Sequence, residues 1–146
     1  MRVSIIENKK IIHTIKTSGN FANDMTFSPD GKYLACAFGN QVQIFTFENM
    51  KRTHAYYPSG NNSKFVITKI KWHPNPEILQ VITADLQHTI SIFDYILNKV
   101  VASSHANEGG NDFCISEDGK MLLSIKDKEI RGFDLRGLKL IYRIPA

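Results

Sequence analysis

The chain has 146 residues, of which 42% are hydrophobic and 22% are charged, and its formal net charge is +4. This balance is ordinary for a globular protein, and the excess of basic residues is too small to indicate nucleic-acid binding. No apolar run approaches the roughly 20 residues that a membrane span needs, and Glu7, Lys9 and Lys10 interrupt what would be the core of a secretory signal. We therefore expect a cytoplasmic or nuclear protein.

The first 16 residues read as two short strands joined by a polar turn. The segment VSII at 3–6 has the same pattern as VQIF at 42–45, ISIF at 90–93 and IRGF at 130–133. After each of these segments comes a polar turn and a further apolar strand, which here covers residues 11–16. No segment has a helical period of useful length, so we expect an all-β chain.

The stretch at 23–57 predicts four strands in a row. Residues 24–28 form the first strand, and Pro29-Asp30-Gly31 has the composition of a tight turn. An apolar strand at 33–37, a turn at 38–40 and an alternating strand at 41–47 follow, before the fourth strand at 53–57.

The same order of strands and turns occurs twice more, at 67–104 and at 111–144. The matching positions Phe27, Trp72 and Ile115 are 45 and 43 residues apart. A strand-only repeat of roughly 40–50 residues is typical of β-propellers. The predicted units are therefore a half unit at 1–16 and three complete units at 23–57, 67–104 and 111–144.

These segments resemble the WD-repeat β-propeller family. The resemblance is carried by FSPDGKYLACA (27–37), IKWHPNPEILQVITAD (70–85), TISIFDY (89–95), ISEDGKMLLSI (115–125) and IRGFDLR (130–136). It implies four-stranded antiparallel blades in an incomplete propeller. The segment at 90–102 also looks like the bacterial surface propellers, but Trp72-His73-Pro74 and the FDLR segment favour the WD-repeat type.

The chain departs from the family at the Trp-Asp pair that names it. Phe45-Thr46, Phe93-Asp94 and Phe133-Asp134 stand in its place, and the Gly-His pair before each first strand is absent. The hydrogen-bonded Trp–Ser/Thr–His–Asp chain that the resemblance implies cannot form as usual, because phenylalanine has no N–H group. We expect the three phenylalanines to be buried between blades that apolar packing holds together.

Half a propeller would leave both terminal blades with an apolar sheet face in water. We expect Val3, Ile5 and Ile6 to line one open face, and Leu122, Ile130 and Phe133 to line the other. The chain is then either a piece of a longer polypeptide or a subunit completed by another chain. Its expected partners are other protein subunits or the missing blades.

Catalytic and metal-binding patterns do not emerge from the sequence. The five histidines lack ligand spacing, Cys36 and Cys114 are far apart, and Gly109-Gly110 precedes no helix. The aspartates recur at equivalent turn and strand-start positions, where turn chemistry explains them. We expect no enzyme activity, no cofactor and no metal.

One rim of the propeller should carry the loops at 17–23, 38–40, 58–65, 85–88, 105–111 and 126–128. Aromatic side chains in polar loops are suited to anchoring a protein partner. The candidate partner-binding residues on this rim are Phe21, Asn61, Asn62, Lys64, Phe65, His88, His105, Lys126 and Lys128. Lysines on the same edge leave RNA as a weaker alternative, since no stacking aromatics are interleaved with them.

Three functions follow from these observations. The first is a non-enzymatic scaffold that contributes blades to a multi-protein complex, such as a nuclear or ribosome-biogenesis complex. The second is a substrate receptor of a cullin-type ubiquitin ligase, because Phe133, Asp134 and Arg136 resemble the adaptor-docking ending of such receptors, in which Arg136 would reach an acidic pocket. The third is a propeller hydrolase or lactonase.

Overall fold

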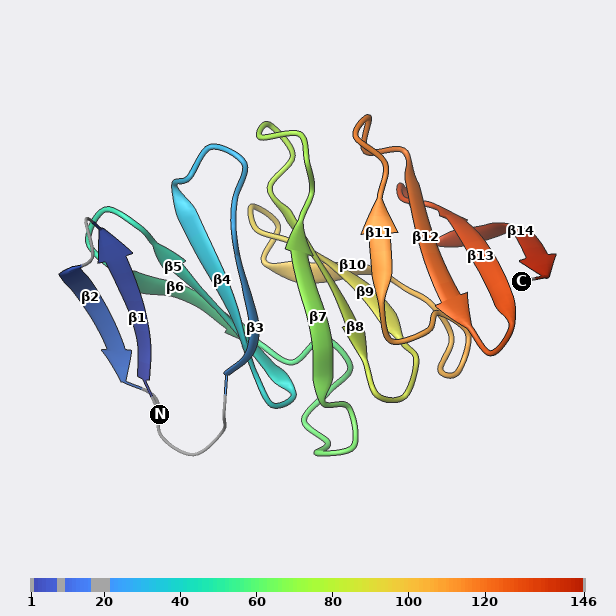
Figure 1. Cartoon of the computed structure of the whole chain (residues 1–146), viewed down its shortest axis with the longest axis horizontal. Helices are drawn as coiled ribbons and strands as arrows, with labels where there is room; N and C mark the ends of the chain where they lie inside the picture. The colour runs from blue at the N-terminus through green and yellow to red at the C-terminus, as the bar shows by residue number, and fades with distance from the viewer. Residues whose placement is uncertain (1, 8–9, 17–21, 146) are drawn as a thin grey trace.

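The computed structural model describes residues 2–7, 10–16 and 22–145, which form a row of antiparallel β-sheets (Figure 1). The hairpin sheet pairs β1 (Arg2–Glu7) with β2 (Lys10–Lys16). The first sheet contains β3 (Ala22–Phe27), β4 (Tyr33–Phe38), β5 (Gln41–Thr46) and β6 (Lys51–Tyr56). The second contains β7 (Ile67–Trp72), β8 (Gln80–Asp85), β9 (Ile90–Asp94) and β10 (Lys99–Ser103). The third contains β11 (Phe113–Ile115), β12 (Met121–Lys126), β13 (Glu129–Asp134) and β14 (Lys139–Pro145).

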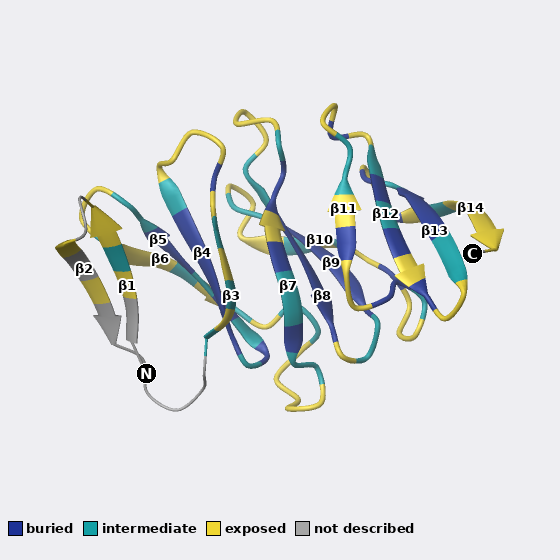
Figure 2. Cartoon of the chain, in the orientation of Figure 1, coloured by how far each residue is buried: buried dark blue, intermediate teal, exposed yellow. Residues whose placement is uncertain are grey.

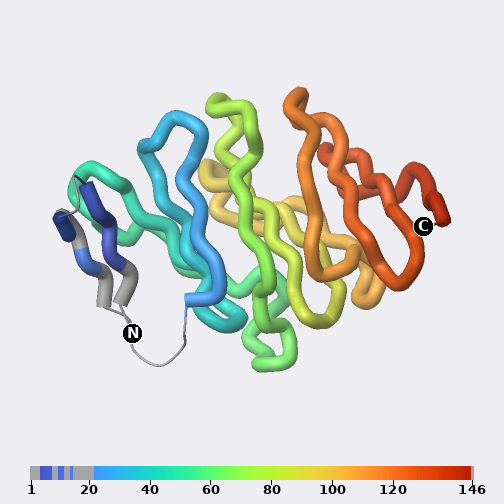
Figure 3. Tube along the Cα trace, in the orientation of Figure 1, coloured from blue at the N-terminus to red at the C-terminus, as the bar shows by residue number. Residues whose placement is uncertain are grey.

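Each four-stranded sheet pairs its strands in chain order, and the sheets stand side by side as an open array. The hairpin sheet lies at one end of the array and β14 lies at the other (Figure 3). The predicted fold class is confirmed: the described residues are all-β, and the four-stranded antiparallel sheets have the form of propeller blades in an unclosed propeller.

The turns after β3 and β11 have one geometry, which the Ser-x-Asp-Gly sequence produces. In the first, the Ser28 hydroxyl donates to Asp30 (2.7 Å), and the Gly31 N–H donates to the Ser28 carbonyl (2.9 Å). The turn at Gly119 repeats these contacts with Ser116 and Asp118. Both glycines have positive φ, at 73° and 71°, a conformation that L side chains rarely adopt.

The core lies between the sheets, and the middle strands carry most of it (Figure 2). Between the first and second sheets, the rings of Tyr56 and Phe93 stack with centroids 3.7 Å apart. Tyr95 packs against Tyr33 (4.8 Å) and His54 (4.1 Å) beside them. Stacked and tilted rings of this kind add to the free energy gained by burying their area.

The predicted burial of the three phenylalanines is confirmed. Phe45, Phe93 and Phe133 are 4%, 2% and 0% exposed, and each lies on the third strand of its sheet, facing the preceding sheet. At the hairpin end, the expectation for Ile5 is wrong: it does not line an open face, because it packs on the cluster that contains Phe45, whereas Ile6 is 64% exposed. The side chain of Val3 lies outside what the structure describes.

One expectation about the open end of the array is wrong. Leu122 and Phe133 do not line an open face, because both are fully buried against the second sheet. The two residues are cross-strand partners, so their side chains share one face of the third sheet. The opposite face carries Leu123, Ile125 and Ile130, the last of which was expected there.

Hydrogen bonds also join the sheets, in addition to the expected apolar packing. The Asp24 carboxylate of the first sheet accepts from the Ile70 backbone N–H (3.0 Å), and the Trp72 indole N–H donates to the Thr26 carbonyl (3.2 Å). Asp112 pairs with Lys69 of the second sheet at 2.8 Å. Asp24 and Asp112 therefore link neighbouring sheets, whereas turn chemistry alone was expected for them.

His73 connects the second and third sheets. It is 5% exposed, its Nδ1 accepts from the Asn75 backbone N–H (3.1 Å), and its Nε2 therefore donates to the Gly119 carbonyl (3.2 Å). Burial lowers the pKa of the His73 ring, against the opposing effect of the Gly119 carbonyl. His54 is similar, since its Nε2 lies 3.1 Å from the Tyr95 carbonyl and burial lowers its pKa.

We predict that Gly119→Ala destabilises the chain more than Gly31→Ala. Both substitutions place alanine at positive φ, which costs about 1–2 kcal/mol. A Cβ at Gly31 would meet nothing within 4 Å, whereas a Cβ at Gly119 would lie 2.3 Å from His73 Cε1. Chemical denaturation should show an additional loss of about 1–3 kcal/mol for Gly119→Ala. Equal losses for the two variants would contradict the His73 contact.

We also predict that the free energy of unfolding falls as the pH is lowered from 7.5 to 5.5. Because the pKa values of His54 and His73 are lowered in the folded chain, the unfolded chain binds more protons below pH 6.5. The contribution of the two histidines to the free energy of unfolding is therefore complete above pH 6.5. It is lost progressively as the pH falls from 6.5 toward their lower pKa values in the folded chain. Denaturation at several pH values should show that the free energy of unfolding depends less steeply on pH in the His73→Gln variant. The same change at the exposed His105 is the control and should leave the slope unchanged.

Candidate interaction surfaces

The loops expected on one rim do lie together. The Ile67 N–H at the start of β7 donates to the Gly39 carbonyl of the β4–β5 turn (2.8 Å), and the Asn40 side chain donates to that of Asn61 in the β6–β7 loop (3.3 Å). In the next sheet, the Gly109 N–H donates to the His88 carbonyl (2.7 Å). Among the described residues, hydrogen bonds thus fasten the β6–β7 and β10–β11 loops to neighbouring tight turns on this rim.

The proposed rim residues differ in their exposure. Asn61, Asn62 and Lys64 are exposed, and the Lys64 ammonium lies 5.2 Å from the centroid of the half-buried Phe65 ring. The other described positions are His88, half-buried, and His105 and Lys128, both exposed. Phe21 lies outside the described residues.

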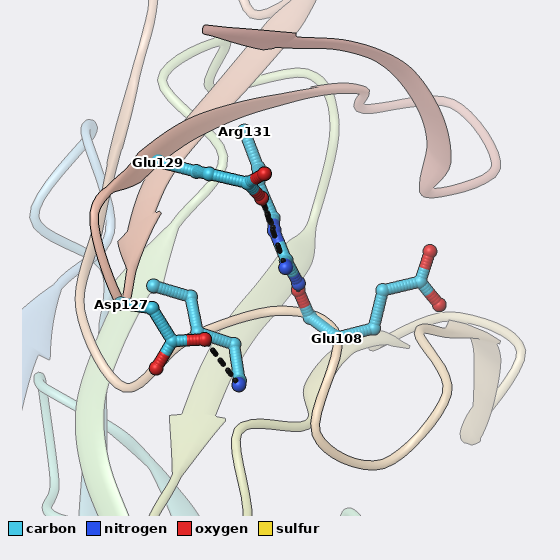
Figure 4. A network of polar contacts seen from close by, with 5 residues as sticks. Glu108, Asp127, Glu129 and Arg131 are labelled. Carbon is cyan, nitrogen blue, oxygen red and sulfur yellow. Dashed lines mark hydrogen bonds and ion pairs between the residues drawn. The ribbon is translucent and has the colours of Figure 1, made fainter. Parts of the chain in front are cut away.

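Two basic residues at this rim are buried, and one of them, Lys126, was expected to bind a partner. Lys126 is 9% exposed and pairs with Asp127 at 3.1 Å. Arg131 is 8% exposed, binds Glu129 through Nε and Nη2, each 3.1 Å from the same oxygen, and donates through Nη1 to the Glu108 carbonyl (Figure 4). Arg131 therefore fastens the β10–β11 loop to the third sheet, and its donors are engaged within the chain.

The third sheet has an apolar face that no other part of the described chain covers. Strand register makes Leu123 and Ile125 equivalent to Ala35 and Ala37 of the first sheet, all of which point toward the next position in the array. The alanines are fully buried by the second sheet, whereas Ile125 is 62% exposed. Ile144, the cross-strand partner of Ile130, is 48% exposed.

Gly132 gives this open face a shape that the first two sheets lack. At the equivalent positions of β5 and β9 the chain has Ile44 and Ile92. The Tyr142 ring lies over Gly132, where an added Cβ would be 2.4 Å from the tyrosine Cζ. The absence of a side chain at Gly132 therefore lets the ring lie flat on the sheet.

A hollow of about 520 Å³ lies beside the same face, lined in part by Cys114, Leu123 and Ile130. The Cys114 thiol is free and exposed. The other thiol, Cys36, is free and buried, and burial raises its pKa to about 12. The hollow is mainly apolar, which suits the burial of apolar side chains from a partner.

The segment proposed for adaptor docking is divided between the core and the surface. Phe133 is fully buried, whereas Arg136 is exposed. The Arg136 guanidinium donates to both carboxylate oxygens of Asp134, through Nε (3.2 Å) and Nη2 (2.9 Å). These hydrogen bonds lower the pKa of Asp134 to about 2. An acidic pocket on an adaptor would have to compete with Asp134 for the guanidinium.

Among the described residues, no three histidine, cysteine or acidic side chains converge in a way that would hold a metal ion. The same part of the chain contains no helix with the length and apolar character needed to cross a membrane.

Comparison with known families adds one finding to this geometry. Residues 9–46 match the family described as WD domain, G-beta repeat. The match runs from the hairpin sheet to the end of β5, across the boundary between the first two units of the array. No curated protein sequence matches the chain. Residues 9–46 are therefore similar to a WD repeat, and the four-stranded antiparallel sheets of the array have the form of β-propeller blades.

Proposed function

We propose that the chain is a non-enzymatic scaffold that contributes propeller blades to a multi-protein assembly through the open face of its third sheet. WD40 repeat domains are typically protein-interaction modules. The observation that carries the proposal is the exposure of Ile125 and Ile144 at positions where the preceding sheets are covered.

The physical argument rests on apolar area. Each large aliphatic side chain left in water forgoes about 1.5–3 kcal/mol of burial free energy. Leu123, Ile125, Ile130 and Ile144 lie together on this face, so the total is comparable with the stability of a small domain. A partner that presents a complementary sheet face recovers this free energy, as the second sheet does for the first.

The ubiquitin-ligase alternative remains a narrower proposal for the same chain. It uses a different surface, because Arg136 lies in the β13–β14 turn rather than on the open sheet face. Arg136→Ala would abolish adaptor binding under that alternative. Under the scaffold proposal, the same variant keeps the assembly mediated by the open face.

We predict that the purified chain self-associates and that Ile125→Lys suppresses this association. A lysine at an exposed position of the open face leaves the folded sheet intact but opposes the burial of that face against another molecule. Sedimentation velocity over a range of concentrations should show large species for the unsubstituted chain and mainly monomer for the variant. The variant should keep a cooperative thermal melt, at a temperature that no longer rises with protein concentration.

Val101→Lys is the matched control, since Val101 is a 39% exposed aliphatic residue on β10, away from the open face. This control should behave as the unsubstituted chain does. A monodisperse, cooperatively melting monomer for the unsubstituted chain would falsify the proposal, as would equal suppression by both lysines.

A further inference from the structure

The turn between the third and fourth strands is the same in all three four-stranded sheets. In each, four residues join a cross-strand pair: Thr46 with Lys51, Asp94 with Lys99, and Asp134 with Lys139. The last of the four residues has φ of 51°, 53° and 53° at Met50, Asn98 and Leu138. One backbone conformation is therefore produced by three different sequences.

The second sheet fills this turn with exposed aliphatic residues. Its central positions are Ile96 and Leu97, where the first sheet has Glu48 and Asn49 and the third has Arg136 and Gly137. Ile96 is 73% exposed and Leu97 is 59% exposed. The polar turns of the other sheets have the same conformation, so neither packing nor turn geometry requires aliphatic side chains here.

The two residues border a groove between the second and third sheets, on the rim opposite the long loops. The groove has a volume of about 500 Å³, and its lining includes Ile78, which is 38% exposed, and the buried Leu135. A space of this size accommodates a few residues of an extended peptide.

Charges at the groove favour a basic ligand. Glu77 and Asp94 are in its lining, and Arg136 is its one arginine or lysine. Asp134 already neutralises the Arg136 guanidinium through the two hydrogen bonds described above. Within the part of the chain that the structure describes, neither Glu77 nor Asp94 forms an ion pair, so the groove carries excess negative charge.

We propose that this groove binds a short extended peptide of another protein, in which a large apolar side chain is flanked by lysine or arginine. The apolar side chain is buried among Ile78, Ile96 and Leu97, and the flanking cations face Glu77 and Asp94. This site is separate from the open face of the third sheet, so the chain can be held in an assembly and still bind such a peptide.

The test is a fluorescence-anisotropy titration of the full chain, in the assembly in which it purifies, with three labelled peptides. The first has the sequence Gly-Lys-Leu-Phe-Lys-Gly, the second replaces both lysines by glutamate, and the third replaces Leu-Phe by Ser-Ser. We expect the first peptide to bind at least tenfold more tightly than the other two. Glu77→Lys should weaken its binding.

The decisive variant transplants the turn of the first sheet into the second, as the double substitution Ile96→Glu and Leu97→Asn. It adds a negative charge, so weaker binding of the lysine peptide reports the loss of apolar contact. We expect a loss of at least tenfold, with the fold retained because the first sheet forms this turn from the same two residues.

Leu86→Asn is the control, since Leu86 is a 51% exposed aliphatic residue on the opposite rim. Its binding of the first peptide should be unchanged. The proposal is overturned if no peptide binds, if all three bind equally, or if the transplanted turn binds as tightly as the original.

Discussion

The structure depends on the packing of sheets that are apolar on both faces. Along β4, Leu34 and Cys36 face the hairpin sheet, whereas Ala35 and Ala37 face the second sheet, and all four are buried. A strand with this pattern is stable only between two neighbours, because either face alone would be exposed to water. Each sheet therefore needs the next, and the requirement passes along the array to the third sheet, whose outer face is open.

Polar contacts give this apolar stack a defined register. Asp24 and Trp72 bond across the first interface, and His73 bonds across the second. Each contact satisfies a buried polar group that would otherwise be costly, so sliding one sheet along another breaks a hydrogen bond as well as a packing contact. Ser124 is an exception, because its buried hydroxyl has no hydrogen-bond partner in the described chain. Phe133, on the neighbouring strand, offers no side-chain donor.

The sequence predicts the repeat well because each repeat carries its own turn chemistry and its own alternation of apolar residues. The buried phenylalanines and the two Ser-x-Asp-Gly turns were recognisable for that reason. Contacts between repeats were not recognisable, since they join groups far apart in the sequence, such as the His73 ring and the Gly119 carbonyl, 46 residues apart. The face to which Leu122 points was also mispredicted. Both faces of β12 are apolar, so alternation alone does not say which one meets the second sheet.

The burial of Lys126 and Arg131 shows a related limit of sequence patterns. Lys126 ends β12 and Arg131 lies within β13, and charged residues are rarely buried unless they are paired. Arg131 is buried because it binds Glu129 and the Glu108 carbonyl of the β10–β11 loop, and the second contact joins residues 23 apart in the sequence. The reverse holds at Ile96 and Leu97, which are large aliphatic residues and yet are exposed in the structure.

The two exposed apolar surfaces differ in size and charge, and this difference separates the roles that they can have. The open face of the third sheet spans several strands and is mainly aliphatic, as in obligate interfaces that resemble a domain core. The groove at Ile96 and Leu97 is small and bordered by carboxylates. A small contact contributes little binding free energy, so it suits a partner that binds transiently. The charges at the groove then determine which ligand binds. A chain with both surfaces can be a permanent part of one assembly and a reversible binding site for another protein.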